Sequence, residues 1–102
     1  MVSDHFLEEL ANDFFMQALE IAKLDEPTIA IDYFSIAFGL YRQVENTDLM
    51  HLSVKWLSHL GLEGDELKLK LNYGTGLARY GIDIVDVVNA FFQPKDTYTN
   101  SA

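Results

Sequence analysis

Three histidines are the side chains of this chain that could hold a metal ion, because it contains no cysteine. His51 and His59 are eight residues apart, which separates them by about 12 Å on a helix, too far to share one small ion. His5 and Glu9 are one helical turn apart, but two ligands are fewer than the three or four of a zinc site. The sequence therefore predicts no metal site and no cofactor.

Acidic pairs could supply acid–base chemistry, but most of them stand at expected helix starts, where the helix dipole favours acids. Asp32 is different, because its neighbours from Ile31 to Ile36 are mostly apolar. A buried carboxylate needs a partner, and we expect a tyrosine hydroxyl, another helix end or a second protein in that role. A small enzyme or ligand-binding bundle that uses Asp32, Tyr33, Tyr41 and a histidine is one alternative. We predict instead no enzyme and no catalytic residue.

Two short motifs have the outline of known sites without their chemistry. The loop Gly74-Thr75-Gly76 lacks the third glycine of a dinucleotide site and the lysine of a P-loop. The stretch 56–67 has the outline of a helix-turn-helix. Acidic residues, which phosphates repel, would enter the major groove there: Glu63, Asp65 and Glu66. We predict no direct binding of nucleic acid.

Negative charge is concentrated in the first third of the chain. The net charge of the 102 residues is −9. Residues 1–32 carry −7, with eight acids against Lys23, and residues 33–102 carry −2, with eight acids against six bases. Such a field favours basic partners and repels phosphates and anionic lipid. The residues that we predict to bind a partner are Glu9, Asp13, Glu20 and Asp32.

Composition indicates one folded domain. Hydrophobic residues make up 49% of the chain, more than disordered segments contain. The start of the chain resembles no signal peptide, and the most apolar stretch, Ile29–Tyr41, is too short to span a bilayer. We therefore expect a cytoplasmic protein that does not bind membranes.

Apolar residues at helical spacing predict an all-α fold, a compact bundle of about five helices. Their predicted ranges are 4–24, 27–44, 47–60, 65–80 and 83–93. The strict alternation over 66–73 leaves an α+β fold with a short strand there as an alternative. Residues 1–94 would form a single helical domain, and 95–102 a mobile polar tail.

Glycines and apolar or polar residues also predict how the helices pack, begin and end. The second helix is apolar almost all round, so we expect it to be central, with Gly39 where another helix packs closely. Gly74–Gly76 should bend or interrupt the fourth helix, and Gly81 should end it. The residues that we expect to cap helix starts are Ser3 or Asp4, Asp25 and Asp83. The residues that we expect to pack inward from the last helix are Ile84, Val85, Val88, Phe91 and Phe92.

Apolar side chains exceed what a five-helix domain of this size can bury. Examples are the second helix, Phe14-Phe15-Met16 and Phe91-Phe92. A homodimer would cover the excess. We predict a small acidic protein–protein interaction or regulatory module without catalytic activity that associates with itself and binds a protein partner, a basic one. The alternative is an acidic inhibitor or antidote, such as a nucleic-acid mimic, that masks a basic surface of its partner.

Overall fold

The computed structural model describes residues 2–92, and the side chains of residues 2–90. It contains four helices: α1 (Asp4–Lys23), α2 (Pro27–Gln43), α3 (Thr47–His59) and α4 (Gly64–Phe92). The predicted all-helical class is confirmed. The alternative strand over 66–73 is wrong, because that segment is the first part of α4. The tail predicted for 95–102 lies outside the described residues.

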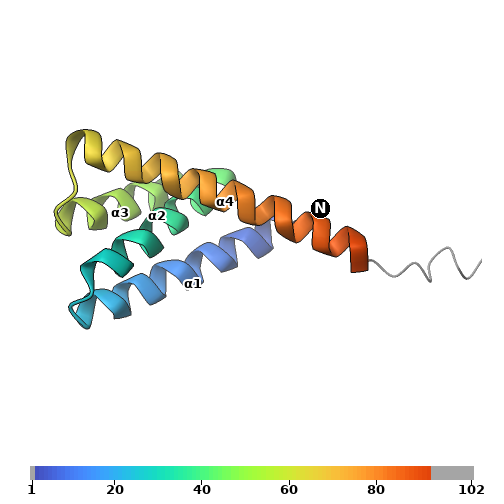
Figure 1. Cartoon of the computed structure of the whole chain (residues 1–102), viewed down its shortest axis with the longest axis horizontal. Helices are drawn as coiled ribbons and strands as arrows, with labels where there is room; N and C mark the ends of the chain where they lie inside the picture. Colours follow the sequence, from blue (N-terminus) through green and yellow to red (C-terminus); the bar gives the residue numbers. More distant parts are fainter. Residues whose placement is uncertain (1, 93–102) are drawn as a thin grey trace, which may run out of the picture.

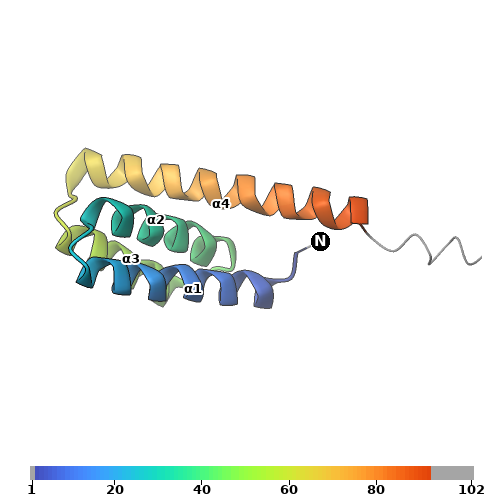
Figure 2. The same cartoon turned by 60° about the horizontal axis from the view of Figure 1, so that its bottom comes forward.

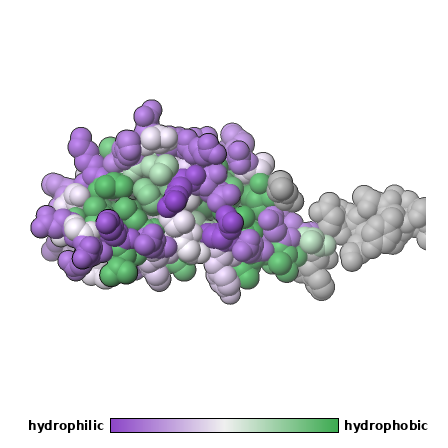
Figure 3. Space-filling view, turned by 90° about the horizontal axis from the view of Figure 1, so that it is seen from above, coloured by the Kyte–Doolittle hydropathy of each residue, from purple (hydrophilic) through white to green (hydrophobic). Residues whose placement is uncertain are grey.

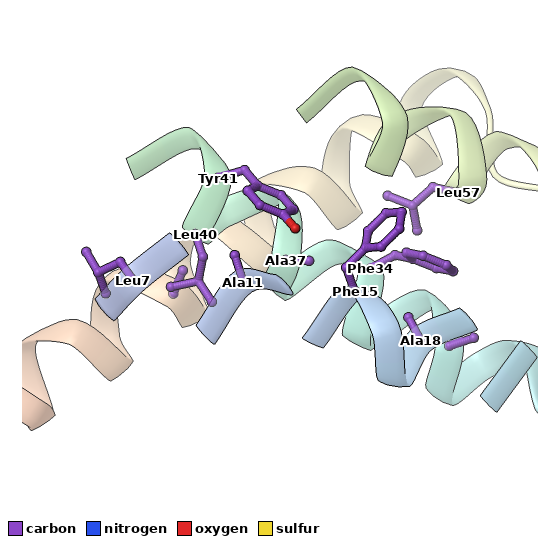
Figure 4. Close-up of a cluster of buried hydrophobic side chains, with 11 residues drawn as sticks. Leu7, Ala11, Phe15, Ala18, Phe34, Ala37, Leu40, Tyr41 and Leu57 are labelled. Carbon is purple, nitrogen blue, oxygen red and sulfur yellow. The ribbon is translucent and has the colours of Figure 1, made fainter. Parts of the chain in front are cut away.

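The second helix, α2, is the centre of the bundle (Figure 1), as its composition predicts. It packs against α1, α3 and α4, and these three contact one another far less. Its aromatic residues Phe34 and Tyr41 are fully buried. Figure 4 shows this core, to which α1 contributes small and large side chains: Leu7, Ala11, Phe15 and Ala18.

Aromatic rings join α1, α2 and α3 inside this core. Phe34 is stacked on Trp56 of α3, with ring centroids 5.6 Å apart and an angle of 8° between the planes. Phe15 of α1 also meets Phe34 edge-on, with ring centroids 5.3 Å apart. Aromatic pairs of this kind contribute about 1 kcal/mol each beyond the area that they bury. Phe34 therefore fixes the relative positions of three helices.

Local sequence explains where most helices begin and end. The backbone N–H of Phe6 donates a hydrogen bond to the Ser3 side chain at 3.1 Å, so Ser3 caps α1. Asn46 caps α3 in the same way. The predicted cap at Asp25 is wrong, because Asp25 takes the left-handed conformation (φ 62°) of the turn after α1, and Glu26 precedes α2.

The fourth helix, α4, runs without interruption through the two helices that the sequence predicts there, so the predicted count of five is wrong. Gly81 does not end a helix, and Asp83 does not cap one. At 1.5 Å per residue, its 29 residues make a rod of about 43 Å. The rod continues past the N-terminal end of α1 (Figure 2).

The helices α2 and α4 cross closely where Gly39 meets Gly74. A Cβ atom on Gly39 would lie 2.6 Å from the Gly74 carbonyl oxygen, and one on Gly74 would overlap the backbone of Ser35. The prediction that another helix packs closely at Gly39 is confirmed. The Ser35 hydroxyl donates to the Ile31 carbonyl at 2.7 Å within α2, so its burial leaves no unsatisfied donor.

Candidate protein-binding groove

An apolar groove of about 350 Å³ lies between α1 and the second half of α4. It forms because both helices pack on α2 and make few contacts with each other within the described residues. The side chains that define its walls come from α1, α2 and α4: Phe6, Leu10, Phe14, Ile36, Ile82 and Val85.

The chemistry of the groove is almost entirely hydrocarbon. Small-molecule sites of this volume usually place a few polar groups so that they orient the ligand. No charged or amide side chain lines this groove among the described residues. Gly81 keeps part of its wall open, since a Cβ atom there would meet no described atom within 4 Å. The groove therefore suits apolar side chains better than a polar substrate.

Three of the four predicted partner-binding residues lie together on the exposed side of α1. Glu9, Asp13 and Glu20, here called the acidic ridge, are all exposed. Their neighbours are also at the surface: His5 Nε2 lies 3.1 Å from Glu9, and Lys23 Nζ lies 3.6 Å from Glu20. Contacts this exposed contribute little to stability, so the ridge remains accessible to a partner.

The acidic ridge borders the groove. Asp13 follows Phe6 by seven residues, which brings the two side chains to nearly the same side of α1 at about 100° per residue. Phe6 lines the groove and is itself 48% exposed. Negative charge and apolar surface are therefore neighbours along one edge of α1.

Asp32, the fourth predicted residue, lies elsewhere and forms an ion pair. Its Oδ1 atom is 2.6 Å from Lys70 Nζ of α4, and its side chain is 42% exposed. The Oδ1 atom itself is buried, as predicted, but its partner is a lysine rather than a tyrosine hydroxyl or a helix end. The ammonium of Lys70 also lies 4.8 Å from the centre of the Tyr73 ring. Asp32 therefore links α2 to α4 and is not part of the acidic ridge on α1.

A polar network that sequence reasoning missed joins α1, α2 and the start of α3. The Tyr41 hydroxyl donates to Asn12 Oδ1, and Asn46 Nδ2 donates to Glu8 Oε2 at 2.7 Å. Burial, followed by the nearby charge of Glu8, raises the pKa of Tyr41 to about 12. The hydroxyl therefore stays protonated as a donor. The one-turn spacing of Glu8 and Asn12 was the available signal.

The residues of the alternative enzyme site are not brought together. Tyr33 packs edge-on against Phe14 at 5.4 Å, whereas Tyr41 donates to Asn12 and Asp32 pairs with Lys70. His59 packs against the Trp56 ring at 5.5 Å. Across residues 2–90, no three histidine or acidic side chains are grouped closely enough to hold a metal ion.

A second apolar surface follows the outward face of α4. Its exposed members include Leu69 (70%), Tyr80 (66%) and Val87 (66%). We call the whole set the outward stripe: Leu69, Tyr73, Gly76, Tyr80, Ile84 and Val87. Hydrophobic side chains reach the surface in several places on the face of the molecule that carries α4 (Figure 3).

The stripe also corrects the predicted inward packing of the last helix. Ile84 is 45% exposed and Val88 is 44% exposed, while Val85 is partly buried at the groove. Phe91 and Phe92 lie outside the side chains that the structure describes. The cause is the length of α4, whose second half extends beyond the helices that would cover it.

The chain matches no protein-family model, no curated protein and no solved structure. Over residues 2–92, the structure has no helix with the length and apolar character needed to cross a membrane. Function is therefore inferred from the groove, the acidic ridge and the outward stripe.

Proposed function

We propose that this protein is a small acidic interaction or regulatory module without catalytic activity, which binds a protein partner and associates with itself. The observation that carries the proposal is the hydrocarbon groove bordered by the acidic ridge. The occupant that fits both features is the apolar face of an amphipathic helix with basic residues along its edge.

The energies are consistent with such a partner. Burying one leucine side chain contributes about 2 kcal/mol, so two or three inserted side chains give a useful affinity even after the cost of association. Glu9 and Asp13 would add charge complementarity, which raises the association rate and selects against acidic helices. A small polar substrate would gain neither benefit.

Titration with two synthetic helical peptides tests this proposal. Both peptides carry the same leucine face, one flanked by lysines and the other by glutamates. We expect the lysine peptide to bind and to shift the NMR signals of Phe6, Ile82 and Val85, and the glutamate peptide to bind at least tenfold more weakly. Absence of shifts at the groove with both peptides would rule out the groove as a helix-binding site.

A matched pair of variants separates groove binding from general attraction to an acidic protein. Gly76 and Gly81 both lie in α4, and a Cβ atom on either would meet no described atom within 4 Å, but only Gly81 lines the groove. Gly81→Arg should weaken the lysine peptide at least tenfold, and Gly76→Arg should leave its affinity unchanged. Equal losses in both variants would mean that the peptide binds through net charge alone.

The alternative function, an acidic inhibitor that masks a basic surface, is supported by the exposure of the ridge. It differs from groove binding in which residues matter. Replacing Glu9, Asp13 and Glu20 by glutamine would abolish binding to a masked basic surface. For a helix held in the groove, the same change should lower affinity only severalfold, because the apolar contacts remain.

A further inference from the structure

The outward stripe has the spacing of a helix-pairing surface. Its six positions follow one another at intervals of four, three, four, four and three residues. At about 100° per residue, they fall within a sector of about 80° on α4. The side of α4 that packs on α2 is opposite, and includes Leu67, Leu71 and Ala78. Helix α4 is therefore apolar on two opposite faces, and residues 2–90 cover one of them.

Gly76, in the middle of the stripe, has no packing role within the described chain. A glycine inside a helix costs about 1 kcal/mol relative to alanine. Gly74 allows the close crossing with α2, but a Cβ atom on Gly76 would meet no described atom within 4 Å. Tyr73 and Tyr80, both exposed, lie one turn away on either side. Because Gly76 has no side chain, the backbone between these two rings is open to close approach by a second helix.

The charges beside the stripe distinguish between the two possible directions of a second α4. Residues 64–90 carry four acids and three bases, a net charge of −1, so two α4 helices repel each other little. Residues 1–32 carry −7 and would repel a second copy of themselves strongly. In an antiparallel pair centred on Gly76, Lys68 of one copy lies near Asp83 of the other. In a parallel pair in register, opposite flanks of the two helices meet at the same height, so Asp65 of one copy would lie near Glu66 of the other and repel it.

We propose that two copies of this protein associate through the outward stripes of their α4 helices, antiparallel and centred on Gly76. This inference rests on the proposed function, of which it names one partner. The stripe involves fewer residues than the roughly 20 a side of a standard interface, so the dimer should dissociate on dilution. No stripe residue lines the groove, so the dimer leaves the groove open.

Sedimentation of the full chain over a range of concentrations tests the pairing. The wild type should show a reversible dimer, and Gly76→Arg should weaken it at least tenfold, because two arginines would face each other at its centre. Gly81→Arg, with the same change in charge on the same helix, should dimerise as the wild type does. A wild type that stays monomeric, a folded Gly76→Arg variant that dimerises normally, or a loss confined to Gly81→Arg would overturn the proposal.

The peptide titration keeps this result separate from the proposed function. If Gly76→Arg is monomeric and still binds the lysine peptide, both proposals stand. If the wild type binds the peptide but does not dimerise, the stripe proposal fails and the groove proposal survives. If it dimerises but binds neither peptide, the groove proposal fails.

Disulfide trapping tests the direction, with no background because the chain has no cysteine. In the antiparallel pair, Gly76→Cys brings two cysteines together, and the oxidised protein should become a covalent dimer. The two cysteines of Val87→Cys would be about 33 Å apart along the helix axes, well beyond the roughly 7 Å that a disulfide allows. Efficient cross-linking by Val87→Cys, or none by Gly76→Cys in a protein that dimerises, would contradict the antiparallel arrangement.

Discussion

The two halves of α4 have similar apolar spacing but different surroundings. In the first half, Leu67, Leu71 and Gly74 face α2 and help to close the core. In the second half, Ile82 and Val85 line an open groove, and Tyr80 and Val87 are exposed. The difference is in the neighbours, because α1 and α2 cover the second half only in part. A helix longer than its bundle thus presents apolar surface to partners.

The glycines of α4 give the sharpest contrast between a covered and an uncovered position. Gly74→Ala should destabilise the fold by about 2 kcal/mol or more, because its Cβ would overlap Ser35 and force α2 and α4 apart. Gly76→Ala should instead stabilise it by up to about 1 kcal/mol through helix propensity. Urea unfolding followed by Trp56 fluorescence measures both. Equal effects of the two substitutions would mean that the close crossing is not as described.

Alkaline pH should lower the stability of the fold through Tyr41, which donates from α2 to Asn12 of α1. The pKa of Tyr41 is about 12 in the folded chain against 10.0 ordinarily, so between these values the unfolded chain releases a proton that the folded chain retains. Stability therefore falls as the pH rises from 10 to 12, by about 2 kcal/mol in total.

Tyr41→Phe isolates this contribution. The variant should lose about 1 kcal/mol at neutral pH, because the hydrogen bond to Asn12 is gone, and its stability should fall less steeply above pH 10. Unfolding curves of both proteins at several pH values provide the measurement. Parallel alkaline losses in the two proteins would show that Tyr41 is not the group responsible.

Charge exchange beside the outward stripe should have the smallest effect. Lys68→Asp or Asp83→Lys alone should weaken dimerisation about threefold, because exposed pairs contribute well under 1 kcal/mol each. The double variant should recover the wild-type dissociation constant, since each pair is restored with its signs reversed. Sedimentation gives all four constants, and a double variant weaker than both single variants would argue against the antiparallel register.

Sequence patterns predict the helical class, the central place of α2 and the close packing at Gly39 correctly, because these depend on apolar spacing within one segment. They fail where the outcome depends on a distant neighbour. The glycines of α4 resemble helix breaks in the sequence, since nothing local shows that Gly74 packs against Ser35. The apolar sequence around Asp32 does not reveal its partner, because Lys70 is 38 positions away in the chain.

The candidate site is predicted only in part for the same reason. Helical periodicity places Glu9, Asp13 and Glu20 on one side of α1, and all three are exposed. The groove involves three helices, and no periodicity within one of them reveals a gap between two others. A cytoplasmic location, a basic partner and self-association remain predictions.

Hydrogen–deuterium exchange along α4, measured at low and high protein concentration, tests the central claim that its second half is a binding element. The account predicts that the amides of residues 68–78, which have acceptors within the helix, are protected at both concentrations. Those of residues 79–90 should exchange quickly in dilute protein and become protected when the protein is concentrated. Uniform protection along α4 that does not change with concentration would contradict it.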